Sequence, residues 1–273
     1  MNNKWKKFLR DWIPPKLRLL LNRNRNVIWS GNYASWSEAQ RASAGYDSRI
    51  ILDKVRAALI KVRNGEAVYE RDSVLFDEIY YSWPLLAGLM WIAALSKGHL
   101  NIIDFGGSLG STYFQNRKFF HTLPKISWNI VEQAHFVKTG KEFFEDDCLQ
   151  FYYDIEDCIH KKLPNAILLS SVVQYMEEPY MLLKKIIPMG FDFILFDRTS
   201  FICKGNDRLT IQTVSSEIYP ASYPCWFFDR QKFYSFFKDD YDLIEEFDAL
   251  AGIMKIDNME AGYDKGFIFR RKA

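Results

Sequence analysis

The chain has 273 residues, of which 48% are hydrophobic and 26% are charged, a globular composition that can bury a sizeable core and argues against long disorder. Residues 1–25 carry eight Lys or Arg against one Asp, a charge of +7, so the net charge of +2 leaves −5 for the remaining chain. Because a nucleic-acid surface would spread its basic residues over the fold, we expect no nucleic-acid partner.

The four cysteines are widely spaced and include no C-x-x-C pair, so we expect neither a zinc site nor a disulfide framework. The expectation is a reduced, cytoplasmic protein. The longest apolar run, Trp83 to Leu95, has thirteen residues and is too short to span a bilayer. Charges and Pro14-Pro15 interrupt the apolar residues at the start, which is not typical of a secretory signal.

Residues 1–25 are predicted to contain a basic amphipathic helix. Its apolar residues recur at the spacing of one helix face, namely Trp5, Phe8, Leu9, Trp12 and Ile13. Tryptophan beside lysine and arginine suits a helix at an anionic membrane surface, which would place the protein at the inner face of the cell membrane. The alternative, weighted equally, is that this helix docks on its own domain.

Residues 26–98 are predicted to be a helical segment ahead of the main domain. Ser35 to Glu38 has the form of a capping box. Apolar residues from Ile51 to Val62 then mark one helix face that should stop at Asn64-Gly65, and a second helix is expected from Pro84 to Lys97. Such helices cover a cofactor pocket or build an acceptor site.

Residues 99–273 alternate between strand and helix patterns and are predicted to form an α/β domain. The expected strands are 101–105, 127–132, 149–153, 166–170 and 191–196, and the expected helices are 112–121, 136–145 and 179–187. Regular alternation implies a parallel sheet covered on both faces, with all strand ends on one edge.

After the fifth strand the pattern changes. A long loop at 198–224 contains a short strand at 210–214, and a helix capped by Asp229 follows. The final runs, 242–247 and 266–271, have too little between them for a crossover helix and should pair antiparallel. The prediction is a doubly wound, Rossmann-like sheet of seven strands, mostly parallel, whose last strand is inserted antiparallel.

A glycine-rich turn follows the first strand of this domain. It comprises Asp104, Phe105, Gly106, Gly107, Ser108 and Gly110. Glycines there let the strand turn sharply and let the backbone approach a ligand. The dinucleotide pattern G-x-G-x-x-G is absent, and the spacing instead fits the looser D/E-x-G-x-G-x-G turn of S-adenosylmethionine (SAM) methyltransferases. The alternative is a glycine-rich turn with no ligand.

Polar residues follow the later strands on the same edge. Glu132, with Gln133 beside it, lies twenty-two residues beyond Gly110, where a carboxylate can accept from both ribose hydroxyls. Asp154 could accept from the adenine amine while Ile155 packs on the ring. The residues after the fourth strand would line the channel to the acceptor, and they are Ser170, Ser171, Gln174 and Tyr175. Ordinary surface or loop roles are the alternatives.

The chain from about Trp29 to Arg271 resembles a family of class I SAM-dependent methyltransferases encoded in bacterial surface-polysaccharide gene clusters. The resemblance is carried by DFGGSLGSTYFQNR, WNIVEQAHFVKTGKEFFED, SSVVQYMEEP, FDRTSF, YPCWFF and KGFIFRR. It implies a SAM cofactor and an acceptor from a saccharide pathway, a glycan or a lipid- or nucleotide-linked precursor. It implies cofactor positions at Asp104, Gly106, Gly110, Glu132 and Asp154, and Ser108 departs from the commonest glycine.

A sugar hydroxyl would need a general base as it attacks a methyl group. The candidates are Asp197, His135 and Tyr175, with Asp197 as the first choice because it ends the fifth strand. An ionised phosphate or carboxylate acceptor would need cations instead, from Arg117, Arg198, Lys204 or Arg208. Aromatic residues predicted to face the acceptor are Tyr113, Phe114, Tyr223 and Trp226, although most aromatics are core.

Two other functions compete with methyl transfer. One is an NAD(P)-dependent sugar-modifying oxidoreductase, which the glycine spacing and the lack of a Tyr-x-x-x-Lys pair disfavour. The other is a non-catalytic, cofactor-binding relative. Acids occur singly on the predicted edge and no histidine accompanies them, so we expect no metal site.

Overall fold

The computed structural model describes residues 27–45, 48–71, 73–214 and 221–273. The amphipathic helix expected in residues 1–25 lies outside them. Within the described ranges, no helix combines the length and the apolar character needed to cross a membrane.

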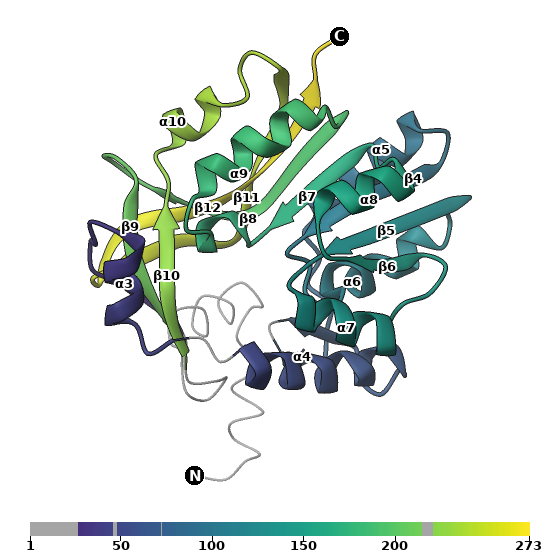
Figure 1. Cartoon of the computed structure of the whole chain (residues 1–273), viewed down its shortest axis with the longest axis horizontal. Helices are drawn as coiled ribbons and strands as arrows, with labels where there is room; N and C mark the ends of the chain where they lie inside the picture. Colours follow the sequence, from purple (N-terminus) through teal and green to yellow (C-terminus); the bar gives the residue numbers. More distant parts are fainter. Residues whose placement is uncertain (1–26, 46–47, 72, 215–220) are drawn as a thin grey trace, which may run out of the picture.

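A large twisted sheet runs through the molecule (Figure 1). Its order in the described residues is β10-β9-β1-β11-β12-β8-β7-β4-β5-β6. Its strands are β1 (Val27–Ser30), β4 (His99–Phe105), β5 (Lys125–Val131), β6 (Leu149–Tyr152), β7 (Ala166–Ser170), β8 (Phe193–Ile202), β9 (Arg208–Val214), β10 (Ala221–Phe227), β11 (Tyr241–Ile256) and β12 (Met259–Arg271).

The predicted doubly wound sheet is confirmed. Strands β4 to β8 pair in parallel in the order β6-β5-β4-β7-β8. Strand β12 inserts between β8 and β11 and is antiparallel to both, as the short connection between the last two runs predicts. The sheet has three strands more than the seven expected, because β1, β9 and β10 extend it beyond β11.

Helices cover both faces of the parallel strands. The helices of the domain are α6 (Ser111–Phe120), α7 (Ala134–Phe143), α8 (Ile155–Lys162), α9 (Pro179–Ile186) and α10 (Arg230–Ser235), with 3-10 turns η1 (Val173–Tyr175) and η2 (Ile187–Met189). Adjacent strand residues point to opposite faces. Ile102 packs in the layer that holds α4 (Ser48–Arg63), α5 (Trp83–Leu95), α6 and α7. Ile103 packs in the layer of α8, α9 and α10.

The segment before β4 is not wholly helical. It contains β1 and the elements α3 (Trp36–Ala42), α4 (Ser48–Arg63), β2 (Tyr69–Arg71), β3 (Val74–Phe76) and α5 (Trp83–Leu95). The predicted capping box is present, because the Ser35 hydroxyl accepts from the Glu38 amide and the Glu38 carboxylate accepts from the Ala34 amide. The antiparallel hairpin of β2 and β3 was not predicted, and neither was α8.

Candidate cofactor and acceptor site

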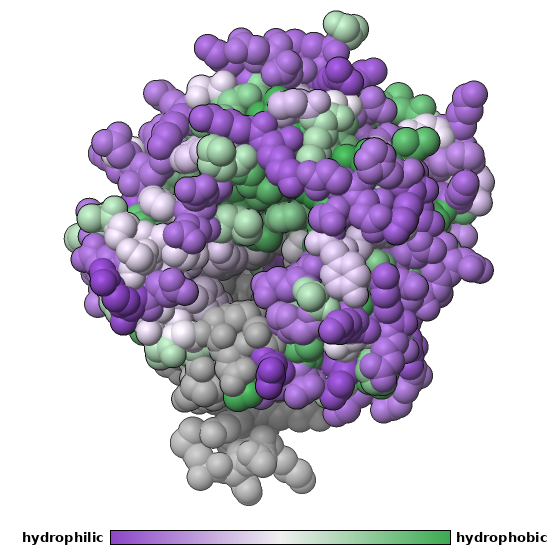
Figure 2. Space-filling model, viewed as in Figure 1, coloured by the Kyte–Doolittle hydropathy of each residue, from purple (hydrophilic) through white to green (hydrophobic). Residues whose placement is uncertain are grey.

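The site lies where the direction of winding reverses. Strands β5 and β6 follow β4 on one side, and β7 and β8 lie on the other, so a crevice opens beyond the carboxyl ends of β4 and β7. A cavity of about 490 Å³ occupies this crevice. The face seen in Figure 2 is hollowed near its centre, where apolar side chains show between polar lobes.

The glycine-rich turn forms one wall of the cavity. Gly106 has a φ of +70° and Ser108 a φ of +55°, both in the left-handed region that favours glycine. Ser108 therefore adopts the backbone conformation for which the motif commonly has glycine. A Cβ on Gly107 would lie 2.5 Å from the carboxyl carbon of Asp104, so only glycine allows the turn to close over that side chain.

Asp104 is a buried acid beneath this turn and is only 1% exposed. Its Oδ2 accepts a hydrogen bond from the Trp128 indole at 3.0 Å, while its Oδ1 is buried and has no hydrogen-bond partner among the described residues. Burial raises the pKa of Asp104 to about 7, and the hydrogen bond from Trp128 and the charge of Arg198 oppose that rise. A cationic group in the cavity would stabilise the carboxylate.

Glu132 follows β5 on the same edge. Its Oε2 accepts from the Gln133 backbone amide at 2.6 Å, and both residues line the cavity. Burial raises the pKa of Glu132, and hydrogen bonds from the Gln133 and Ser108 amides partly offset this effect. The carboxylate is thus held rigidly beside the turn, with further lone pairs for a ligand's hydroxyl groups.

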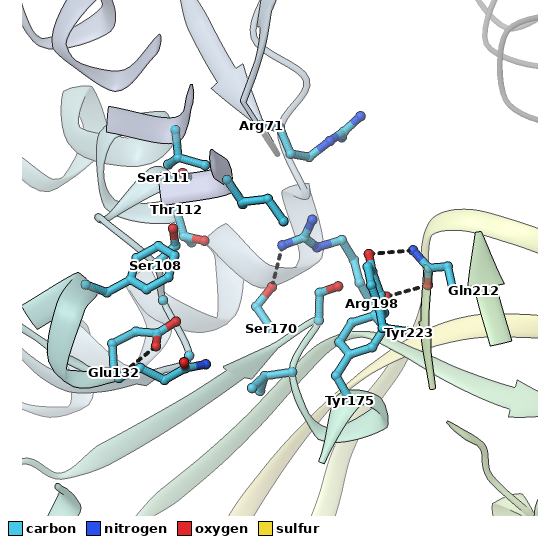
Figure 3. Close-up of a pocket in the computed structure, with 18 of the residues that line it drawn as sticks. Arg71, Ser108, Ser111, Thr112, Glu132, Ser170, Tyr175, Arg198, Gln212 and Tyr223 are labelled. Carbon is cyan, nitrogen blue, oxygen red and sulfur yellow. Dashed lines mark hydrogen bonds between the residues drawn. The ribbon is translucent and has the colours of Figure 1, made fainter. Parts of the chain in front are cut away.

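Arg198 lies in the middle of the close-up, between Glu132 and Ser108 on one side and Gln212 and Tyr223 on the other (Figure 3). Its guanidinium donates to the Ser170 hydroxyl at 3.2 Å. Its Nε lies 3.4 Å from Asp197 Oδ2. Arg198 has a φ of +53°, and such strained positions concentrate at functional sites.

A hydrogen-bonded network forms the far side of the cavity. Tyr175 donates its phenolic hydrogen to Gln212 Oε1 at 2.8 Å, and the Gln212 amide nitrogen donates to the Tyr223 oxygen at 3.1 Å. The Trp29 indole also donates to Gln212 Oε1, at 3.1 Å. Gln212 thus joins strands β1, β9 and β10 to η1 and fixes two aromatic rings at the wall.

The structure brings most of the predicted site residues to this cavity. Those that line it are Asp104, Gly106, Gly107, Ser108, Glu132, Gln133, Ser170, Ser171, Tyr175, Arg198 and Tyr223. Asp197 instead lines a second cavity of about 500 Å³ that shares Arg198 with the first.

The remaining predicted residues line neither cavity. Asp154 caps α8, Ile155 is buried in the layer of that helix, Gly110 caps α6 and Phe105 packs beside the core. Tyr113 packs in the aromatic core, Arg117 lies over Phe114, and the Trp226 ring packs against Leu209 and Ile211. Gln174 donates to the Arg198 carbonyl, and the His135 ring contacts Phe136. Direct ligand contacts by these residues stay predictions.

Several lining residues carry no signal in the sequence. Glu70 and Arg71 belong to the unpredicted hairpin. Glu70 is 1% exposed, and its Oε2 accepts from the Ser111 hydroxyl at 2.7 Å, at the start of α6. Gln212 lies on a predicted strand, but only the pairing of β9 with β10 brings it opposite Tyr223.

No protein-family model matches the chain, and neither does any curated protein sequence. Solved structures of similar shape include a SAM-dependent methyltransferase from Clostridium acetobutylicum, with 7% identity over 71% of this chain and 93% of that one and a TM-score of 0.45. Another is the N-terminal domain of EvdMO1, solved with SAH and D-fucose. It shares 13% identity over 84% of this chain and 98% of that one, with a TM-score of 0.46.

The CcbJ methyltransferase from Streptomyces caelestis is a third similar structure. It shares 8% identity over 69% of this chain and 89% of that one, with a TM-score of 0.43. At such low identities and TM-scores these likenesses assign neither a family nor an activity to this chain.

Proposed function

We propose that this protein is a SAM-dependent methyltransferase that acts on oxygen. The observation that carries the proposal is the buried Asp104 carboxylate under Gly107, with an oxygen that has no hydrogen-bond partner among the described residues. The amino-acid end of SAM carries an ammonium group and a sulfonium, and Asp104 faces the turn where such cations would be held. Bound SAM supplies a methyl group already activated for in-line displacement.

The charges around the turn favour this cofactor over a dinucleotide. A pyrophosphate binds best at a helix N-terminus free of other anions. Here the start of α6 already contacts the Glu70 carboxylate through Ser111, and Asp104 and Glu132 lie on the same cavity. A pyrophosphate would meet three carboxylates, whereas a cation would be attracted to them.

Each residue group then has a role in binding or alignment. Glu132 would accept from the ribose hydroxyls, and the Gly106 to Ser108 turn would let the backbone contact the donor closely. The in-line geometry that methyl transfer requires would come from this rigid turn together with Arg198. For a hydroxyl acceptor, Asp197 is the candidate base, because it ends the parallel part of β8 and lines the second cavity, which shares Arg198 with the first.

We further propose that the acceptor is a glycan or a glycan precursor of surface-polysaccharide biosynthesis. The resemblance given by the sequence strings supports this acceptor class. Aromatic residues of the kind that stack on sugar rings line both cavities, among them Tyr175, Tyr223 and Tyr81.

Calorimetric titration with SAM and with NAD tests the cofactor. We expect binding of SAM and none of NAD. Glu132→Gln should weaken SAM binding roughly tenfold or more, because a charge-assisted hydrogen bond to the ribose is lost. Glu142→Gln, an exposed acid on α7, is the matched control and should bind as the wild type does. Undiminished binding by Glu132→Gln would reject the assignment.

The acceptor oxygen is tested by turnover of Asp197→Asn on a cell-extract glycan pool. A hydroxyl acceptor predicts a large loss of methyl transfer with SAM affinity retained, because the proton then has no acceptor. Unchanged turnover over the pH range would exclude Asp197 as the base.

A further inference from the structure

A second cavity of about 500 Å³ lies beside the first. It is walled by the segment before and at the start of α5, by part of β11, and by Asp197 and Arg198 of β8. The two cavities share four lining residues, which are Arg71, Ser111, Thr112 and Arg198. These four residues therefore form a boundary that ligands in either cavity could contact.

A bulge in β8 explains how Asp197 and Arg198 both reach the second cavity. Consecutive residues of a regular strand point to opposite faces. The β8–β12 register shifts between the pairs of Lys265 and Phe267, and Arg198 takes a left-handed conformation at this point. Bulges of this kind redirect side chains, and here two neighbouring residues face one cavity.

The walls of the second cavity combine aromatic rings with positive charge. Tyr80, Tyr81 and Trp83 line it, and the Tyr81 and Trp83 rings lie 4.9 Å apart. The two acidic residues that line the second cavity already contact hydrogen-bond donors or cations. Asp197 faces Ser82, Ser170 and Arg198, and Asp248 pairs with Lys265 at 2.7 Å.

Arg71 supplies the unbalanced charge. Its guanidinium lies 5.3 Å from the centroid of the Phe76 ring, and no described carboxylate forms an ion pair with it. Arg71 lines both cavities, as Arg198 does, and an arginine at such a boundary is suited to a planar or tetrahedral anion.

We propose that the second cavity binds the acceptor, and that the acceptor is a ring compound carrying an ionised carboxylate or phosphate. The aromatic side chains would contact the ring, and Arg71 and Arg198 would hold the acid group at the boundary of the two cavities. That this ligand is the methyl acceptor rests on the proposed methyl-transfer function. Anion binding in the second cavity stands independently of it.

The test is ligand-observed NMR on the full chain with excess SAH, using D-glucuronate, D-glucose 6-phosphate and D-glucose as probes. We expect binding of at least one acidic probe and none of glucose. The two acids distinguish a carboxylate ligand from a phosphate ligand. Arg71→Gln and Tyr81→Ala should each weaken that binding about tenfold or more. Tyr81 lines only the second cavity, so Tyr81→Ala should leave SAM affinity unchanged.

Arg56→Gln is the matched control, because Arg56 lies over the Phe143 ring at the same 5.3 Å and lines neither cavity. The proposal is overturned if no acidic probe binds, if glucose binds equally well, or if Arg71→Gln binds as the control does. A loss on Tyr223→Ala alone would place the ligand in the first cavity and also overturn it. Failure of SAM binding with retained, Arg71-dependent anion binding would instead reject only the proposed function.

Discussion

The Trp128 indole donates a hydrogen bond to Asp104 Oδ2 at 3.0 Å, inside the core beneath the glycine turn. Trp128 is fully buried and stacks on Phe120 at 5.3 Å, so the donor is fixed in place. The hydrophobic core thus fixes the orientation of a site carboxylate whose second oxygen has no hydrogen-bond partner among the described residues.

The buried Asp104 should make stability depend on pH. Its pKa is raised from 3.8 to about 7, so the folded state favours the protonated acid. The contribution of Asp104 to the unfolding free energy is therefore most favourable below pH 3.8 and is lost as the pH rises to about 7. Asp104→Asn should reduce the fall in unfolding free energy between acid and neutral pH by on the order of 4 kcal/mol, measured by denaturant titration. Asp53→Asn, at an exposed ion pair, is the matched control for the loss of one carboxylate at the surface.

Gly107→Ala should abolish most SAM binding. The added Cβ would lie 2.5 Å from Asp104 Oδ2 and would force the carboxylate or the turn to move. Calorimetry and thermal unfolding together separate loss of the site from loss of the fold. Gly65→Ala is the control, because its left-handed φ of +78° costs about 1 kcal/mol of stability while a Cβ there meets no atom. Normal SAM binding by Gly107→Ala would contradict the conclusion that only glycine lets the turn close over Asp104.

Gln212→Leu should destabilise the far side of the first cavity. Gln212 is 7% exposed, and the change removes a hydrogen-bond partner from Tyr175, Tyr223 and Trp29 at once. We expect a loss of about 1–3 kcal/mol in unfolding free energy. Gln150→Leu removes a single hydrogen bond from Tyr152 and should cost less. Equal losses of unfolding free energy for the two variants would show that the Gln212 network stabilises the fold no more than a single hydrogen bond does.

Deletion of residues 1–25 should release the protein from anionic liposomes in a flotation assay. This segment carries +7 and an apolar stripe, and its attraction to anionic lipid should weaken with salt. Neutral liposomes are the control. If the intact chain does not float with anionic vesicles, the membrane hypothesis is wrong and docking on the chain's own domain is favoured.

Local patterns predicted the core of the fold because neighbouring residues determine them. Each of these patterns involves only a few neighbouring residues. They are the alternating strand and helix periods of residues 99–196, the capping box at Ser35 and the short connection after β11. The hairpin at 69–76 was not predicted, since its three-residue strands include the buried charge of Glu70. Strand β10 begins within the stretch 198–224 that is predicted to be a loop. Its Pro224 is tolerated because β10 is an edge strand, one side of which needs no backbone donor.

The sequence by itself determined that a glycine turn and Glu132 would follow adjacent parallel strands, because the strand period and the crossover rule together place both at one edge. Only the tertiary structure decided that Glu70 and Arg71 join them, that Gln212 links two tyrosines, and that Asp197 faces a second cavity. Those positions depend on pairings between distant segments and on a bulge at Arg198, which no local pattern encodes.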